Sequence, residues 1–175
     1  MRTLTIRSGL AAGLALFAVA APSAARADTC RGTSVLPDAA HLAQARQATL
    51  CLLNVERRHY GLRAFSPSMK LRRASERHSL SMVKSHYFEH GDFMGRIEQT
   101  GYLANSSVWT VGENLAWGGG RVASPSSIVQ MWMHSPGHRQ NILSRSYREV
   151  GIGIVLGTPD GVAGSTYTTD FGRRG

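Results

Sequence analysis

The residues of this 175-residue sequence best suited to chemistry are His90, Glu113 and His138. Each is directly next to a glycine, and each borders apolar residues that would fix the local backbone. Two imidazoles and one carboxylate are the ligand set of an open zinc site, in which water takes the fourth position. The same groups could carry out acid–base chemistry without a metal, with Glu113 orienting one imidazole. No two of the three lie within four residues of each other, so their spacing alone leaves both alternatives open.

A structural role is a third alternative, in which the three side chains only join distant segments by hydrogen bonds.

A serine hydrolase has less support. Ser135 lies three residues before His138, but a serine that caps a helix is bonded to backbone amides and is a poor nucleophile. The sequence also lacks a Gly-x-Ser-x-Gly elbow, a His-Glu-x-x-His motif and a Rossmann fingerprint. We therefore assign no catalytic residue from the sequence alone.

His138 is positioned by the segment Met131–Leu143, which reads MWMHSPGHRQNIL. An apolar helix face ends in this segment, and Ser135-Pro136 has the signature of a helix start. Serine accepts hydrogen bonds from free amides, and proline loses no bond at the first helical position. His138 is therefore predicted in the first turn of a short helix, between two buried anchors.

Hydrophobic period and turn residues predict the other helices. His90 falls in an aromatic loop, and Glu113 falls on a short extended segment. His78 lies on the apolar stripe of a helix and is interpreted as a hydrogen-bonded core residue. The predicted helices cover residues 38–60, 66–85, 92–100 and 124–132, with the loop at 87–92 and the extended segment at 111–117.

A β-hairpin is predicted near the C-terminus, with strands over residues 149–156 and 165–171. Gly151 and Gly153 lie on one face of its first strand, which implies that another element packs closely against that face. Helices around a hairpin and an extended segment predict a mixed α/β architecture in one domain.

An N-terminal export signal is predicted over residues 1–27. Arg2 and Arg7 form its positive region, an apolar run follows from Leu10 to Ala21, and residues 25–27 form a small-x-small cleavage site. The run is too short for a permanent membrane anchor. The residues before Cys30 lack the Leu-small-small pattern that lipidation needs. We expect a protein without a transmembrane segment after cleavage, secreted or held in the cell envelope, with a lead-in at 28–41 and one domain at 42–175.

Charge and cysteine content limit the partners. Removal of the three arginines in the signal lowers the formal net charge from +9 to +6. The remaining arginines are scattered and form no basic run with interleaved aromatic residues, so nucleic acid is not expected as a partner. Anionic wall polymers or lipid headgroups are better candidates. The two cysteines, Cys30 and Cys51, predict one disulfide in an oxidising compartment.

A series of motifs occurs in fixed order along the chain. The motifs are Asn54-Val-Glu-Arg57, Gly61-Leu62, Ala74 to Met82, His90, Gly112-Glu-Asn-Leu-Ala116, Trp132, Ser135-Pro-Gly-His-Arg139, Asn141-Ile-Leu143, Gly151-Ile-Gly153 and Phe171-Gly172. Over residues 42–172 this series resembles the CAP superfamily (cysteine-rich secretory proteins, antigen 5, pathogenesis-related 1), in its short bacterial branch.

The resemblance implies an α+β fold, a three-layer α-β-α sandwich with a small antiparallel sheet. It also implies a central cleft in which His90 and His138 match the two family histidines and Glu113 matches the acid of the Gly-Glu-Asn motif. Larger members have a second acid before the second histidine. This sequence has no carboxylate there, so that position is absent or filled by His134.

Family members are associated with divalent-metal binding, with lipid or sterol binding and with proteolysis. The leading hypothesis is a secreted, non-enzymatic binding module. Its partner would be a cell-wall polymer, a lipid or a protein. In this hypothesis His90 and His138 bind Zn²⁺ or another divalent metal, and Glu113 either binds the metal directly or holds one imidazole. The alternatives are a hydrolase acting on peptide or cell-wall material through a bound metal or His138, and a lipid- or sterol-binding protein.

Overall fold

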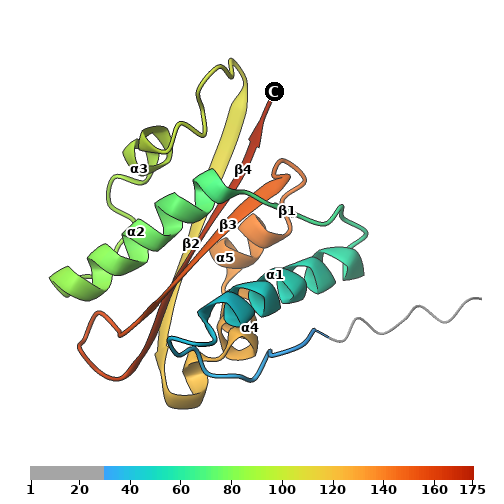
Figure 1. Ribbon diagram of the computed structural model, residues 1–175. Coiled ribbons are helices and arrows are strands. Elements are labelled where there is room, and N and C mark those ends of the chain that lie inside the picture. The colour runs from blue at the N-terminus through green and yellow to red at the C-terminus, as the bar shows by residue number, and fades with distance from the viewer. Residues whose placement is uncertain (1–29) are drawn as a thin grey trace, which may run out of the picture.

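The computed structural model describes residues 30–175 (Figure 1). The predicted signal segment, residues 1–27, and the first two residues of the predicted lead-in lie outside the described part of the chain. No helix among the described residues is long and apolar enough to cross a membrane.

Four strands form one sheet in the order β1-β3-β4-β2. The two outer strands differ greatly in length, because β1 has two residues and β2 has eleven. β4 pairs antiparallel with both β3 and β2, so the predicted hairpin is confirmed, while β1 pairs parallel with β3. The strands are β1 (Ser66–Pro67), β2 (Trp109–Gly119), β3 (Glu149–Leu156) and β4 (Gly164–Arg174). β2 therefore extends beyond the predicted segment at both ends, and it forms one free edge of the sheet.

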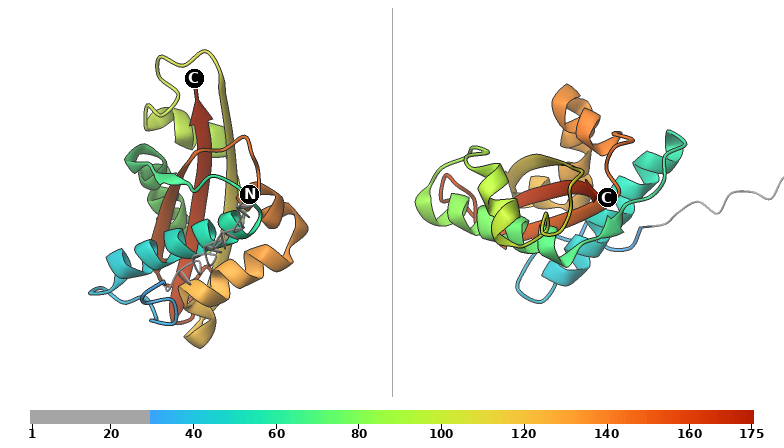
Figure 2. Two further views of the ribbon diagram at one scale, coloured as in Figure 1. Left: turned by 90° about the vertical axis from the view of Figure 1, so that its right-hand side faces the viewer. Right: turned by 90° about the horizontal axis from the view of Figure 1, so that it is seen from above.

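Helices cover both faces of this sheet, which confirms the predicted α-β-α sandwich. The left view of Figure 2 shows α2 and α3 on one side of the strands and α4 and α5 on the other. The helices are α1 (Leu42–His59), α2 (Met69–Ser85), α3 (Phe93–Gln99), α4 (Pro125–His134) and α5 (Pro136–Ile142), with a 3-10 turn at Gly120–Ala123. The larger core lies between the sheet and α1 and α4, and it includes Trp132, Tyr167 and Phe171.

The glycines of β3 explain how α2 approaches the sheet. A Cβ on Gly151 would overlap the α2 backbone at Leu71 and Arg72, and one on Gly153 would overlap it at Ser75. The predicted close packing against this strand face is therefore confirmed. It brings the polar side chains of α2 directly over the sheet.

Three predicted helix starts need correction. Ser66-Pro67 does not begin a helix but forms β1, because the Ser66 amide donates to the Arg148 carbonyl (2.9 Å). Proline is tolerated on such an edge strand, and α2 begins after Ser68, whose side chain caps it. Asp38 accepts from the Ala40 and His41 amides in a turn before α1, which starts four residues later.

The third correction concerns α5. Pro136 is its first residue, as predicted, but the Ser135 side chain makes no capping hydrogen bond. Ser135 also ends α4, and its own amide is bonded to the Trp132 carbonyl (3.2 Å). Proline at the first position removes one of the amides that a cap would satisfy. His138 still lies in the first turn of a short helix.

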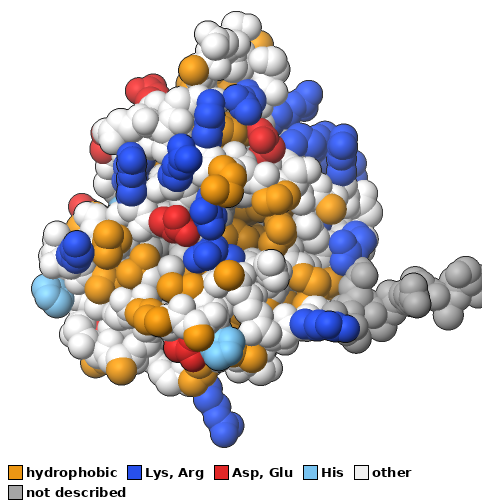
Figure 3. Space-filling model, viewed as in Figure 1, with side chains coloured by type: hydrophobic (Ala, Val, Ile, Leu, Met, Phe, Trp, Pro, Cys, Tyr) orange, Lys and Arg blue, Asp and Glu red, His pale blue; other side chains and the backbone are white. Residues whose placement is uncertain are grey.

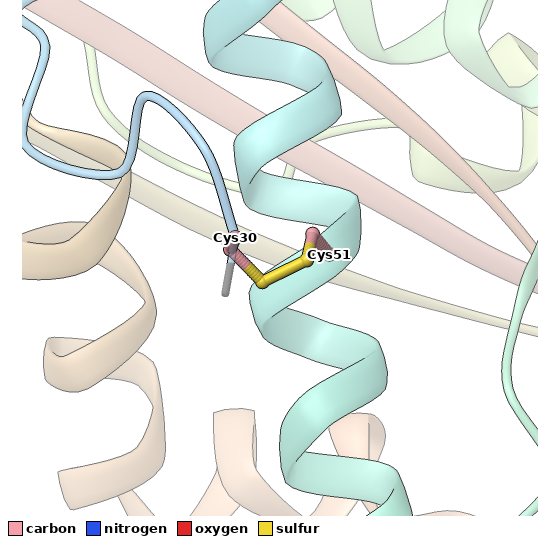
Figure 4. The surroundings of a disulfide bond; sticks show 2 residues. All are labelled: Cys30 and Cys51. Carbon is pink, nitrogen blue, oxygen red and sulfur yellow. A yellow bond between two sulfur atoms is a disulfide. The ribbon is translucent and has the colours of Figure 1, made fainter. Parts of the chain in front are cut away.

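The predicted disulfide is confirmed. Cys30 and Cys51 are bonded, with Cα atoms 5.7 Å apart (Figure 4). The bond ties the first described residue to the middle of α1. The lead-in is further held by a hydrogen bond from the Ser126 amide to the Thr33 carbonyl (2.9 Å).

Candidate functional site

Glu113 is the centre of the candidate site. It lies in β2, and its side chain is only 2% exposed. Both carboxylate oxygens accept short bonds from side chains: Oε1 from His90 Nδ1 (2.7 Å) and Oε2 from Arg96 Nη2 (2.7 Å). A buried carboxylate needs such partners, because burial otherwise favours its neutral form. Both oxygens of the buried Glu113 carboxyl group are therefore satisfied by side-chain partners.

His90 is placed by the loop between α2 and α3. His86, in the left-handed conformation, ends α2, and Gly91, also with positive φ, turns the chain into α3. Asp92 caps α3 by accepting from the Gly95 amide, as predicted. The His90 side chain is 56% exposed although its Nδ1 is bonded to Glu113. Its Nε2 is therefore the ring atom left for a ligand.

Arg96 was not identified from the sequence. It lies in α3, and its contact with Glu113 joins residues 17 positions apart. An arginine four residues after the capping Asp92 is an ordinary helix-surface residue by pattern. The packing of α3 over the sheet brings the Arg96 guanidinium to Glu113, and no sequence pattern indicates this contact.

His138 approaches the site from α5 on the other side of β2. Asn114, next to Glu113, donates from Nδ2 to the His138 carbonyl (3.1 Å). Asn141 donates to the Glu113 carbonyl (3.1 Å) and to the Asn114 side-chain oxygen (2.9 Å). The Asn of the Gly-Glu-Asn motif thus fixes α5 against the free edge of β2, and with it the position of His138.

The His138 imidazole is half-buried and has no hydrogen-bond partner among residues 30–175. Burial, and to a smaller extent the charge of His90, lowers its pKa below the usual value. Asn114 and Asn141 therefore fix the backbone of α5 beside Glu113, and burial favours the neutral form of the His138 ring.

Asp170 is a further member of the site that the sequence analysis missed. It pairs with Glu113 across β4 and β2 and is fully buried. Its Oδ2 accepts from Ser75 Oγ (2.8 Å), while Oδ1 has no donor among the described residues. Burial first, and then the charge of Glu113, raises the pKa of Asp170 well above its usual value. Burial and the neighbouring Glu113 carboxyl group therefore both favour the protonated form of Asp170.

His78 lies behind the site, as a core residue. It is 1% exposed, and its Nε2 is 2.9 Å from the Glu89 carbonyl. Burial is the main cause of its lowered pKa. The bond to Glu89 supports the loop that carries His90, so the predicted core position of His78 is confirmed and His78 also helps to position the site.

His134, considered as a replacement for the missing acid, is exposed on α4. Its Nδ1 is 2.8 Å from the Gln130 carbonyl one turn earlier. Among the described residues His134 has no hydrogen bond to Glu113 or His138. His134 therefore does not replace the missing acid through any hydrogen bond within residues 30–175.

A shallow apolar groove of about 260 Å³ adjoins His138. Its exposed residues include Phe88 and Met131, which are 47% and 38% accessible. Large exposed apolar side chains beside a polar site are typical of an interaction surface. The groove is lined by Phe88, Leu115, Ala116, Trp117, Met131, Trp132, Ser135 and His138.

The donor set defines what the cleft can hold. No group of three or more His, Cys, Asp or Glu side chains among the described residues is arranged to hold a metal ion. Both Glu113 oxygens are already bonded, which leaves two imidazoles, His90 and His138. Neutral imidazole is a good ligand for zinc and related divalent ions. A metal ion in the cleft would therefore have to be held by these two imidazoles and water.

Comparison with known proteins identifies the family of the chain. The sequence model of the "Cysteine-rich secretory protein family" (CAP) matches residues 50–170. The chain is 31% identical over 125 residues to the uncharacterized protein YkwD of Bacillus subtilis (strain 168), covering 69% of this chain and 44% of YkwD. The chain therefore spans less than half the length of this relative.

Solved structures share the fold. An outer surface protein from Borrelia burgdorferi aligns with a TM-score of 0.59 and 17% identity, covering 72% of this chain and 90% of that one. An extracellular protein containing a SCP domain from Bacillus anthracis str. Ames aligns with a TM-score of 0.56 and 23% identity, covering 74% and 43%. At these identities the similarity establishes the fold and not a shared activity.

Proposed function

The chain belongs to the cysteine-rich secretory protein (CAP) family, and we propose that it is an exported, non-enzymatic binding module whose cleft takes a divalent metal through His90 and His138. The single observation that carries this proposal is the bond from His90 Nδ1 to Glu113. It assigns the ring proton to Nδ1, because the carboxylate only accepts. The lone pair on Nε2 is then free for a metal, as in carboxylate–histidine–metal arrangements.

Glu113 acts in this proposal by holding His90 rather than by binding the metal. Arg96 Nη2 binds the second carboxyl oxygen of Glu113 at 2.7 Å, and the buried Asp170 carboxyl group interacts with Glu113 from the core. A carboxylate compensated in this way adds little negative charge to the metal site. The affinity should therefore be modest, well below that of a structural zinc site with four ligands.

A hydrolase is less well supported. Metal-assisted hydrolysis needs a base beside the metal-bound water. Within residues 30–175 the carboxylate bonded to His90 is Glu113, and its oxygens are already engaged by His90 and Arg96. The groove next to His138, with Phe88 and Met131 exposed, instead favours contact with a partner.

Export is proposed on two grounds. The N-terminal segment has the composition of a secretory signal. The Cys30–Cys51 disulfide is typical of proteins that fold in an oxidising compartment. Among the similar structures, one is described as an outer surface protein and one as extracellular.

Zinc titration by calorimetry tests the metal site. Wild type should bind zinc at a pH of about 7.5 and much more weakly at about 5.5, because imidazole must be neutral to act as a ligand. His90→Ala and His138→Ala should each reduce binding by tenfold or more, roughly the effect of losing one of two ligands. His134→Ala is the matched control, since this histidine is exposed and bonded within α4. Its binding should equal that of wild type.

Two outcomes contradict the proposal. Zinc binding that survives both His90→Ala and His138→Ala would place the metal elsewhere. Hydrolysis of peptide or peptidoglycan by the zinc-loaded protein, lost in His138→Ala, would show that the cleft is catalytic.

A further inference from the structure

Four arginines surround a pocket at one end of the sheet, away from the cleft. The pocket has a volume of about 310 Å³ and is lined by Arg63, Ser66, Arg148, Glu149, Arg173 and Arg174. Figure 3 shows Lys and Arg side chains gathered at the upper right, over the end of the sheet where β1 and β3 begin and β4 ends. They come from three segments that are far apart in the sequence, and the sheet register brings these segments together.

The register explains the cluster. Glu149 begins β3 and pairs with Ser66 of β1 on one side and with Gly172 of β4 on the other. Arg148 directly precedes Glu149 in the chain, and Arg173 and Arg174 directly follow Gly172 at the end of β4. Arg63 comes from the loop before β1. Three segments thus deliver guanidinium groups to one short stretch of sheet edge.

Two of these arginines are held in place by the fold. Arg148 Nη1 donates to the carbonyls of Arg145 (2.6 Å) and Tyr147 (3.0 Å), which orients the guanidinium without neutralising its charge. Arg174 Nη1 donates to the Tyr102 carbonyl (3.3 Å), and its guanidinium lies over the Tyr102 ring at 5.0 Å. Side chains held before a ligand binds lose less entropy on binding.

Positive charge in the pocket exceeds negative charge. Glu149 is the acid among the lining residues, and it is shared between Arg174 (3.7 Å) and the Tyr102 hydroxyl (2.7 Å). The guanidinium groups of Arg63 and Arg173 have no hydrogen-bond or ion-pair partner in the described part of the chain. The excess of positive charge also affects the buried Arg57. Burial first, and then the charge of Arg148, lowers the pKa of the Arg57 guanidinium to about 10.

A second groove continues from the pocket. It has a volume of about 290 Å³ and shares Arg173 with the pocket. It passes the exposed residues Val108 and Trp109 at the start of β2. A ligand that fills both therefore extends beyond a single small anion.

We propose that this arginine pocket binds the phosphate groups of a polyanionic ligand. The planar guanidinium group matches two phosphate oxygens at once, which makes arginine better suited than lysine to phosphate recognition. The exposed Arg63 and Arg173 would donate hydrogen bonds to the phosphate oxygens. Arg148 and Arg174, whose guanidinium groups are already held by the fold, would add positive charge. This site is independent of the metal cleft, so either can exist without the other.

Calorimetry with inorganic tripolyphosphate at low ionic strength tests the pocket. Wild type should bind it, and Arg63→Gln/Arg173→Gln should bind about tenfold more weakly or worse, because charge-assisted bonds are lost. Both side chains are exposed and unpartnered, so circular dichroism should show an unchanged fold. Arg73→Gln/Arg77→Gln is the matched control: it removes the same charge from exposed positions on α2 and should bind like wild type.

Further probes define the ligand. Polyglutamate should bind the wild type more weakly than tripolyphosphate does. Equal binding of the two would contradict the proposal, because it would show that the pocket has no preference for phosphate over carboxylate. An equal loss in both double variants, or no tripolyphosphate binding by the wild type, would overturn the site. Sedimentation with phosphatidylglycerol vesicles distinguishes the source of the phosphate. Arginine-dependent cosedimentation indicates a lipid headgroup, whereas tripolyphosphate binding without it indicates a soluble polymer; both results support the pocket.

Discussion

Glu113 and Asp170 are direct partners across the β2–β4 ladder, and they lie on the same face of the sheet. One is a carboxylate compensated by His90 and Arg96, and the other is a fully buried carboxyl group bonded to Ser75. The pair can share one proton but cannot both ionise at this distance without a large electrostatic cost. The candidate metal cleft therefore rests on a buried acid whose raised pKa favours the neutral form.

The pH dependence of stability follows from this pair. The pKa of Asp170 is raised in the folded protein, so the folded state keeps a proton that the unfolded chain releases above about 3.8. The unfolded state then binds fewer protons, and stability falls as the pH rises from that value toward the folded pKa. Asp170→Asn cannot ionise and should flatten this decline. Thermal unfolding of the variant between pH values of about 4 and 8 measures the effect.

Asp160→Asn is the control for loss of one carboxylate, because Asp160 is exposed in the β3–β4 turn. Its stability should decline with pH as in wild type. An Asp170→Asn profile as steep as that of wild type would mean that Asp170 is ionised in the fold.

His78 should contribute to stability and not directly to metal binding. It is buried, and Nε2 is bonded to the Glu89 carbonyl in the loop that holds His90. His78→Ala should lower the free energy of unfolding by about 1–3 kcal/mol, because packing is lost and a carbonyl is left without a donor. Urea unfolding measures the loss, and zinc titration of the folded variant should match wild type. Loss of zinc binding with unchanged stability would assign His78 to the cleft instead.

Gly151 should tolerate no side chain. A Cβ there would overlap the α2 backbone at Leu71 and Arg72, so α2 and β3 would have to move apart and lose close packing. Gly151→Ala should destabilise the fold by roughly 1–3 kcal/mol or more. Gly137→Ala is the matched control, since nothing lies within 4 Å of a Cβ there, and it should leave stability unchanged or slightly raise it. Thermal unfolding of both variants gives the comparison.

The disulfide should stabilise the domain. Cys30 and Cys51 are 21 positions apart, and closing a loop of this length restricts the unfolded chain. Cys30→Ser/Cys51→Ser should lower the free energy of unfolding by about 2–4 kcal/mol. Intact-mass measurement on exported protein tests the bond and the predicted start at Asp28 together. Two free thiols, or a retained N-terminal segment, would contradict both expectations.

The sequence by itself determined most of the elements. The helical and strand patterns, the hairpin, the packing glycines of β3 and the cysteine pair could be interpreted correctly because local period and residue type decide them. The helix starts at Ser66 and Asp38 were wrong, since a Ser-Pro pair or an Asp can serve a strand or a turn as well as a helix. For Ser66 the deciding bond comes from Arg148, more than 80 residues away.

Chemistry, together with the family resemblance, selected His90, Glu113 and His138, but only the tertiary structure decided what surrounds them. Arg96 and Asp170 are ordinary residues of a helix and a strand by pattern. Their contacts with Glu113 arise because α3 packs over the sheet and because the β2–β4 register places Asp170 opposite. The arginine pocket has the same origin. Charges that are scattered along the chain become a site when strand register fixes which ends meet, and no local pattern encodes that register.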